Sequence, residues 1–439
     1  MYGADARNVR NGGSVSINSR IPGLRNSLPA ERRAIVAEHA GIDLHTLDAL
    51  DPSSGLALTQ ADHMIENSVG IIGIPVGVAT NFTVDGRDYL VPMATEEPSV
   101  VAAASNAARM AREHGGFHTS STGPVMIAQI QIVEVADPQA ARFRIMERSA
   151  EILKLAADQD PVLVQFGGGP RAVVVRLIPT RTGVHVVVHL HVDVRDAMGA
   201  NAVNTMAEAI APLLAEISGG RALLRILSNK ADQRLTRVRA VFDRELLGGD
   251  DVVRDIVHAS AFADADPYRA ATHNKGIMNG ITAVVLATGN DTRAVEAGCH
   301  SHAAGPLGYS ALSRYEVDTD GNLVGTLEVP LSVGLVGGAT RVHPTAQAAV
   351  TLLGVQTAAE LSSVIAAVGL AQNLAACRAL AAEGIQRGHM TLHARTLAAS
   401  AGATGDEVSR VADRIVAAGR VRQEYAEEVL AELRAGSSV

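Results

Sequence analysis

The chain has 439 residues, of which 47% are hydrophobic, and this length and composition predict a globular protein of two or three domains rather than a disordered one. The 38 Lys and Arg residues are outnumbered by 46 Asp and Glu residues, and the basic residues form no block that could follow a phosphate backbone, so no nucleic-acid partner is expected. Aromatic residues make up only 3% of the chain, which argues further against base stacking.

The cysteines and the apolar runs bear on the compartment. Cys299 and Cys377 lie far apart and form no Cys-x-x-Cys pattern, so we expect neither a disulfide framework nor a thiolate metal site, and a reducing cytoplasm fits. Residues 1–15 are polar, which predicts a loose extension rather than a signal peptide. The apolar run at residues 69–80 contains Gly and Pro and is too short to span a bilayer, so no membrane is expected.

The first elements after the extension predict a strand, a turn, a strand and a helix. The apolar run at residues 69–80 is followed by the turn pair Asp85-Gly86 and by a second apolar run. Glu96-Glu97-Pro98-Ser99 then opens an Ala-rich helix at residues 100–112. We therefore expect Glu97 at a junction between a strand and a helix.

Residues 124–228 change to strands that alternate with helices. Helical patterns at residues 138–157 and 201–218 flank an extended segment at 161–166 and a strand at 185–194, in which Val and Leu alternate with His. We interpret the His row as a solvent-facing or cofactor-side face rather than a metal site. The pattern predicts a small α+β domain inserted into a larger one. No G-x-G-x-x-G fingerprint is found, so a doubly wound (Rossmann) fold is not expected.

The C-terminal half is predicted to be mainly helical. A helix is expected over residues 251–270, and long Ala/Leu helices over 345–385, with a hairpin turn at Gly321-Asn322 between them. Beyond Gly388 the chain has a distinct amphipathic tail, in which Thr404 to Glu407 form a capping-box pattern.

Four polar residues occur in contexts where burial is expected, and together they could act on a carbonyl group: Glu97, Lys275, Asp291 and His389. Taken singly, each has an ordinary interpretation: Glu97 as a charge at a helix start, Lys275 as a solvated lysine, and Asp291 as a turn cap. His389 and His393 have the spacing of two zinc ligands, but the glutamate of the zinc-protease pattern is missing between them, so no metal is expected.

A second constellation, Asp193 to Asn201, ends a strand and begins a helix that contains a glycine. The exposed N–H groups of such a helix start can hold a pyrophosphate.

In combination and in this order, the motifs resemble those of class II, bacterial-type 3-hydroxy-3-methylglutaryl-CoA (HMG-CoA) reductase, from about Ser19 into the C-terminal tail. The matching motifs are Glu96-Glu97-Pro98-Ser99, Asp196-x-Met198-Gly199-x-Asn201, His273-Asn274-Lys275-Gly276, Gly289-Asn290-Asp291 and Gly388-His389-Met390-x-Leu392-His393. The family interconverts HMG-CoA and mevalonate plus CoA by two successive hydride transfers, through a bound mevaldehyde.

The resemblance implies a role for each catalytic position. Lys275 would polarise the thioester or aldehyde carbonyl, and Glu97 would exchange a proton with its oxygen. Asp291 would hydrogen-bond both residues, and His389 would protonate the departing CoA thiolate. No metal is needed.

The resemblance also implies binding positions. The nicotinamide cofactor would contact Asp196, Met198, Gly199 and Asn201. An aspartate on the adenosine ribose, Asp160 rather than Asp158, would repel a 2′-phosphate and favour NAD over NADP. Positions that match substrate contacts in the family are Arg25, near the CoA phosphates, and Ser99, Arg269 and Asn279.

The architecture implied is α+β, with a large HMG-CoA-binding and dimerisation domain at residues 16–123 and 229–388, a small NAD(H)-binding domain at 124–228, and a helical flap at 389–439. The family forms homo-oligomers whose active sites are shared between subunits. Its interface motif is Glu66-Asn67-Ser68-Val69-Gly70 in this chain, where the family has Val-Ile-Gly at the last three positions.

Two other interpretations of the residues are open to test. An acyl-CoA or aldol-type lyase could use Lys275 as a Schiff-base nucleophile, and a CoA- or nucleotide-sensing module could keep the fold without catalysis. The sequence does not distinguish mevalonate breakdown from synthesis.

Overall fold

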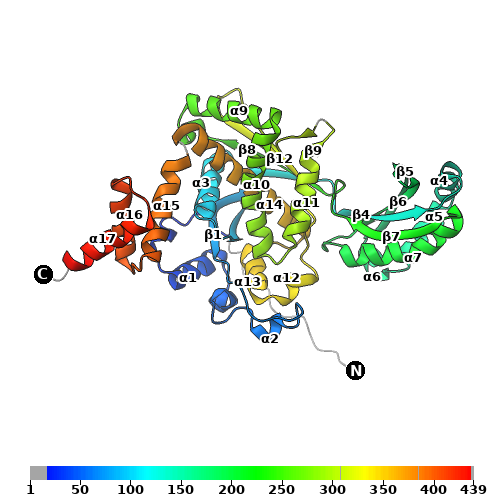
Figure 1. The fold of residues 1–439 in the computed structure, drawn as a ribbon, viewed down its shortest axis with the longest axis horizontal. Helices are drawn as coiled ribbons and strands as arrows, with labels where there is room; N and C mark the ends of the chain where they lie inside the picture. The colour runs from blue at the N-terminus through cyan, green and yellow to red at the C-terminus, as the bar shows by residue number, and fades with distance from the viewer. Residues whose placement is uncertain (1–16, 307, 384, 437–439) are drawn as a thin grey trace.

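The computed structural model describes residues 17–306, 308–383 and 385–436, with the side chains of residues 382–392 and 436 outside the described part. Figure 1 shows a central body of helices around a sheet, a second sheet with its own helices on one side, and a group of C-terminal helices on the other. Each of the three parts has a separate cluster of buried apolar side chains.

The central sheet has six strands in the order β11-β12-β8-β3-β1-β2. Neighbouring strands in this sheet are antiparallel, except that β1 and β3 form a parallel pair. The hairpin of β1 and β2 turns at Asp85 and Gly86, both with positive φ, which confirms the turn predicted there. The strands are β1 (Val76–Val84), β2 (Arg87–Ala94), β3 (Phe117–Ser121), β8 (Leu235–Phe242), β11 (Ser313–Val317) and β12 (Leu323–Pro330).

Long helices cover this sheet, and α14 is central among them. It packs against α3 and α10 and is long and apolar enough to cross a bilayer, but most of its apolar stretch is buried inside the protein. The helices of this body are α3 (Val100–Arg112), α8 (Arg244–Leu247), α9 (Asp250–Ala265), α10 (Pro267–Ala287), α11 (Thr292–Ala303), α12 (Gly338–Val342), α13 (Pro344–Leu353) and α14 (Ala358–Arg378). The short strands β9 (Ala304–Gly305) and β10 (Gly308–Tyr309) follow α11.

The second sheet has the order β5-β6-β4-β7, and all its pairs are antiparallel, so the α+β prediction is confirmed and this part is not a doubly wound fold. In β6 one face is fully buried and the three histidines of the other face are half-buried, as the alternation predicts. The buried side chains are Val186, Val188, Leu190 and Val192. Its elements are β4 (Val125–Val133), α4 (Pro138–Glu147), α5 (Ser149–Ala157), α6 (Pro161–Gln165), β5 (Gly169–Thr180), β6 (Gly183–Asp193), α7 (Ala200–Ser218) and β7 (Arg221–Ser228).

Three local predictions differ from the structure. Residues 161–165 form helix α6 rather than an extended segment, because Asp160 accepts the N–H of Leu163 at 2.9 Å and Pro161 suits the first turn. The helix predicted at 251–270 is two helices, divided at Asp266, which caps α10. Strand β1 begins only at Val76, and the apolar residues before it are exposed.

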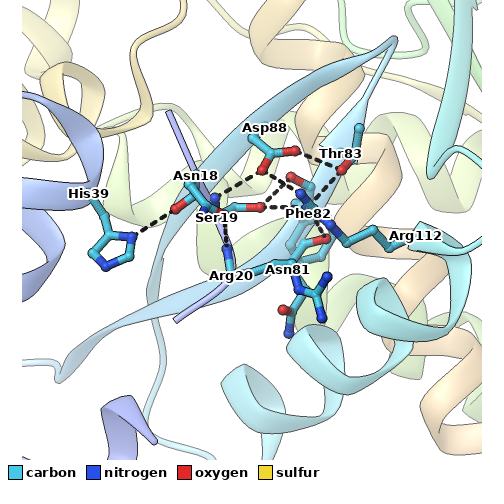
Figure 2. Close-up of polar contacts among 9 residues, drawn as sticks. All are labelled: Asn18, Ser19, Arg20, His39, Asn81, Phe82, Thr83, Asp88 and Arg112. Atoms are coloured by element: carbon cyan, nitrogen blue, oxygen red, sulfur yellow. Dashed lines mark hydrogen bonds and ion pairs between the residues drawn. The ribbon is translucent and has the colours of Figure 1, made fainter. Parts of the chain in front are cut away.

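The N-terminal segment is fastened to the central body by the polar cluster in Figure 2. The Ser19 N–H and Nη2 of Arg112 donate to Oδ2 of Asp88 at 3.0 and 2.7 Å, and the Thr83 hydroxyl donates to Oδ1 at 2.8 Å. The Ser19 hydroxyl donates to the Phe82 carbonyl at 3.0 Å. The cluster therefore joins the segment, the β1–β2 hairpin and the end of α3. The helical elements of this region are η1 (Leu24–Asn26), α1 (Pro29–Ala40), η2 (Leu44–Leu50) and α2 (Leu58–Ala61).

The C-terminal tail folds as three helices with their own apolar contacts. A π-helical turn, Ala379–Glu383, links α14 to α15 (Ile385–Ser400), which is followed by α16 (Asp406–Ala417) and α17 (Gln423–Gly436). Half of the predicted capping box is present: the carboxylate of Glu407 accepts the Thr404 N–H at 2.9 Å.

Candidate active site

Helix α10 presents two polar side chains to Glu97. Lys275 Nζ donates to Oε2 of Glu97 at 2.8 Å, and Asn279 Nδ2 donates to the same oxygen at 3.3 Å. Residues four apart lie on one face of a helix, so the two donors converge. The structure therefore brings together three of the predicted site residues: one carboxyl, one ammonium and one amide.

Glu97 is positioned by the junction between β2 and α3, as predicted. Its N–H donates to the Thr95 hydroxyl at 3.2 Å. Ser99, two residues later, has a φ of 76°, a left-handed conformation that is costly for a residue with a side chain. Such strain is common where a backbone is held for function, and here it lies beside the carboxylate at the start of α3.

Buried polar contacts set the rotation of α10 about its axis. Nε2 of the buried His273 lies 2.7 Å from the Ser313 hydroxyl, and Asn274 accepts the Leu312 N–H at 2.9 Å. Burial, aided by the charge of Arg269, lowers the pKa of His273 to about 4, so this imidazole is neutral at neutral pH. Because His273 and Asn274 face inward, the next residue, Lys275, faces outward.

Asp291 lies apart from this group. Its Oδ1 accepts the N–H groups of Arg293 and Ala294 at 2.9 and 3.2 Å, which caps α11, and it forms an ion pair with the Arg293 side chain at 3.2 Å. Among the described contacts, none joins Asp291 to Lys275 or to Glu97. The sequence predicted that these residues would be buried, but the structure leaves them partly exposed. The exposed fraction is 61% for the Lys275 side chain and 35% for the Glu97 side chain.

Two adjoining cavities lie beside Glu97 and Asp291. A cavity of about 450 Å³ is lined by Glu97, Asn279 and Arg293. A larger one of about 1340 Å³ is lined by Asp291, by the Met198–Asn201 segment and by Asp160. Leu286 and Arg293 line both, so the two cavities adjoin each other.

The larger cavity has room for a ligand the size of a dinucleotide. Its volume exceeds the range of about 300–1,000 Å³ usual for small-molecule sites. Gly199, with a φ of 101°, begins α7 without a side-chain cap, so its first N–H groups are available for phosphate oxygens. A Cβ atom on Gly334 would lie 2.4 Å from the Met198 nitrogen, so the segment containing Met198 depends on a glycine opposite it.

Two predicted cofactor residues have structural contacts of their own. Asp160 lines the cavity, and its Oδ1 caps α6. Asp196 is not among the residues that line it, and its Oδ1 accepts the Ala358 N–H at the start of α14, at 2.7 Å. Asp196 therefore joins the segment to the central body, a contact that the sequence motif did not reveal.

The remaining predicted residues are more scattered. Arg25 is exposed in η1, and Arg269 is half-buried near the start of α10. His389 belongs to α15, but its side chain lies outside the described residues. Among the described His, Cys, Asp and Glu side chains, no three lie together as a metal site.

Sequence comparisons identify relatives over most of the chain. A family model described as hydroxymethylglutaryl-coenzyme A reductase matches residues 29–394. The 3-hydroxy-3-methylglutaryl-coenzyme A reductase of Archaeoglobus fulgidus is 57% identical over 419 residues, which cover 95% of this chain and 96% of the relative. A probable reductase of Borreliella burgdorferi is 37% identical over 339 residues, covering 75% of this chain and 76% of the relative.

Solved structures match the fold as well. A 3-hydroxy-3-methylglutaryl-coenzyme A reductase of Streptococcus pneumoniae superposes with a TM-score of 0.81 at 39% identity, over 94% of this chain and 99% of the other. A class II enzyme of the same organism, bound to NADPH in open conformations, has a TM-score of 0.79 at 40% identity, over 82% of this chain and 99% of the other.

Proposed function

Because the chain belongs to the hydroxymethylglutaryl-coenzyme A reductase family and is an HMG-CoA reductase that uses a nicotinamide cofactor, we propose which of its side chains carry each part of the reaction. The observation that carries the proposal is the convergence of Lys275 and Asn279 on one oxygen of Glu97. A substrate carbonyl oxygen among these three groups would meet a cation, an amide donor and a proton source.

In the proposed mechanism, Lys275 and Asn279 hold the carbonyl oxygen and stabilise the negative charge that develops on it. Glu97 gives a proton to that oxygen when the aldehyde is reduced to the alcohol and takes it back in the reverse direction. A bound reduced nicotinamide supplies the hydride for each of the two transfers. His389 protonates the CoA thiolate that leaves after the first transfer, and the mevaldehyde stays bound for the second.

For the cofactor, the proposal is NAD(H), held at Met198, Gly199 and Asn201. The larger cavity supports it, because these residues and Asp160 line the same space. The carboxylate of Asp160 would accept a hydrogen bond from an adenosine ribose hydroxyl and would repel a 2′-phosphate. Asp291 also lines this cavity, and its negative charge would act on the nicotinamide and on Glu97, which lines the adjoining smaller cavity.

The proposed assembly is a homo-oligomer with active sites shared between subunits. The exposure of the Lys275–Glu97 pair supports it, because a second subunit would supply the missing cover. An apolar segment before β1 supports it too: Val69 is 96% exposed and Ile72 is 90% exposed. Light scattering coupled to size exclusion would give about twice the chain mass of 45.6 kDa for a dimer, and the single-chain mass would contradict the assembly.

The same proposal assigns a function to each part of the chain. Residues 16–123 and 229–388 bind HMG-CoA and form the dimer, residues 124–228 bind the nucleotide, and residues 389–439 close over the site as a flap that carries His389. The enzyme would act in the cytoplasm.

The experiment that tests the proposal follows the near-ultraviolet absorbance of the reduced nicotinamide. Purified protein is mixed with HMG-CoA and either NADH or NADPH, and separately with mevalonate, CoA and either oxidised cofactor. Turnover that prefers NAD(H) is expected. Turnover restricted to NADP(H) would overturn the role of Asp160. Borohydride treatment in the presence of substrate should leave Lys275 unmodified, because the mechanism forms no Schiff base.

A further inference from the structure

Arg234 is a buried arginine between the two sheets, in the segment that returns the chain from β7 to β8. Only 5% of the residue is exposed. One of its nitrogens, Nη1, donates to the carbonyl oxygens of Ala197 and Met198 at 3.1 and 3.3 Å, and the other, Nη2, donates to the carbonyl of Val333 at 2.5 Å. A single guanidinium therefore holds two segments that are distant in the sequence.

Both segments line the larger cavity, one with Met198 and Gly199 and the other with Gly334 and Val336. They also contact each other directly, since the Leu335 N–H donates to the Asp196 carbonyl at 2.9 Å and Ala197 pairs with Val336 as an isolated bridge. The buried guanidinium of Arg234 adds a second connection between these two segments.

The charge of Arg234 is retained despite its burial. Burial lowers its pKa to about 10, against the opposing effect of Asp196 and Asp193, so the group stays protonated at neutral pH. A buried cation is costly unless it is paired and hydrogen-bonded. Three carbonyl oxygens and two nearby carboxylates meet that requirement, and a surface arginine has no need of such an arrangement.

The contact with Met198 also orients the next peptide group. In a trans peptide the C=O and the N–H point in opposite directions, and no cis peptide occurs among the described residues. When the Met198 carbonyl is turned toward Arg234, the N–H of Gly199 is therefore turned away from it. That N–H belongs to the start of α7, where the cofactor phosphates are proposed to bind.

We propose that Arg234 is a positioning residue for the nicotinamide cofactor, and that its guanidinium, by tying the Ala197 and Met198 carbonyls to that of Val333, holds the cofactor segment in its binding conformation. The inference rests on the proposed placement of the cofactor at Met198–Asn201. Arg234 itself touches no ligand in this arrangement and acts through the backbone that it holds.

The test is the dissociation constant of NADH and of NADPH, measured by calorimetry without HMG-CoA, so that no turnover is involved. Arg234→Lys keeps the charge but replaces the planar fork by a single ammonium, which cannot hold both segments at once. Binding of the preferred cofactor is expected to weaken by about tenfold or more, which corresponds to about 1.4 kcal/mol. Binding of HMG-CoA should change by less than about twofold, since the smaller cavity is not attached to Arg234.

A matched control is Arg237→Lys, three positions further on in β8, where Arg237 is half-exposed and pairs with Glu328 at 2.5 Å. This variant should bind both cofactors as the wild type does. Equal cofactor affinity in wild type and Arg234→Lys, or an equal loss in both lysine variants, would overturn the inference.

A second measurement uses only the wild-type protein, so it does not require any variant to fold. In the wild type, NADH or NADPH should increase the hydrogen-exchange protection of the Leu335 and Ala358 amides, which donate to Asp196. If saturating cofactor leaves the protection of both amides unchanged, cofactor binding does not stabilise the contacts of this segment, and the inference is contradicted.

The placement of the cofactor is tested separately by Asn201→Ala, which alters the lining of the cavity without touching Arg234. If this variant binds cofactor normally, the proposed placement is wrong. If it binds weakly while Arg234→Lys binds normally, the placement holds and the role of Arg234 is wrong.

Discussion

The ammonium of Lys275 lies 2.8 Å from a carboxylate oxygen of Glu97, although the two residues are 178 positions apart in the chain. One comes from a long helix and the other from the junction that follows an edge strand of the central sheet. Asn279 reaches the same oxygen from the next turn of the helix. The Lys275 side chain is largely exposed in the single chain, so the contribution of the pair to stability is small. Glu97 lines the smaller cavity, which indicates a role in chemistry.

Replacement of Lys275 by Ala should lower kcat/KM for HMG-CoA by about a thousandfold or more, because it removes about 4 kcal/mol of stabilisation from the developing oxyanion. The side chain is largely exposed, so the unfolding temperature should stay close to that of the wild type. Lys154→Ala is the matched control, since Lys154 also forms a 2.8 Å pair, with Asp158. A loss of less than about tenfold in Lys275→Ala would refute the assigned role.

Replacement of Asp291 by Asn separates the charge of this residue from its capping contact. Asn caps helices about as well as Asp, so α11 should keep its start, whereas Ala would cost about 1 kcal/mol of stability. We expect Asp291→Asn to lose at least about a hundredfold in kcat with little change in unfolding temperature. Full activity in the Asn variant would show that Asp291 is only a helix cap.

Replacement of Asp160 by Ser tests the choice between the two cofactors. Ser keeps the cap of α6 but removes the charge that would repel a 2′-phosphate. The ratio of kcat/KM with NADPH to that with NADH should rise by about tenfold, which corresponds to about 1.4 kcal/mol. Asp158→Ser is the comparison: if it changes the ratio and Asp160→Ser does not, the ribose contact belongs to Asp158.

The Asp88–Arg112 pair predicts a dependence of stability on pH. Burial raises the pKa of Asp88, but hydrogen bonds from Arg112, the Ser19 N–H and Thr83 outweigh it, so the pKa lies below its usual value of 3.8. The unfolded state therefore binds a proton at Asp88 more readily than the folded state does. The stabilisation of the fold by the Asp88 carboxylate is complete above the pKa of Asp88 in the unfolded state. It is lost as the pH falls through the pKa of Asp88 in the folded state.

Asp88→Asn should therefore be less stable than the wild type at about pH 6, by about 2 kcal/mol for a carboxylate whose side chain is only 13% exposed. The difference in apparent Tm between the two proteins should shrink as the pH falls below the unfolded pKa. A difference that stays constant with pH would show that the charge of Asp88 is not the cause.

Replacement of His389 by Asn should separate the two reductions. Only the first releases a thiolate that needs a proton, so turnover of HMG-CoA should fall by at least about a hundredfold while reduction of added mevaldehyde continues. The measurement is the oxidation of reduced cofactor with each substrate in turn. Equal losses with both substrates would contradict a role confined to the thiolate.

Local patterns in the sequence predicted the elements where one kind of signal dominated. The helix at residues 100–112 and the alternating strand β6 were predicted with nearly their observed bounds, because Ala-rich composition and a period of two are strong local signals. Residues 161–165 were predicted wrongly, because a short apolar run does not distinguish a strand from a helix, and the capping by Asp160 decided it.

The sequence by itself determined the family and the residue types of the site, since Glu97, Lys275 and Asn279 occur in motifs that can be recognised in one dimension. Only the tertiary structure decided which of these residues meet. It brought Lys275 and Asn279 to Glu97, kept Asp291 at a helix start, and placed Asp196 on the first turn of α14. It also brought Arg234, which no motif distinguishes from other arginines, to the carbonyls of Met198 and Val333. Hydrogen bonds between distant segments depend on how helices and sheets pack, and the local patterns that a sequence displays do not contain that packing.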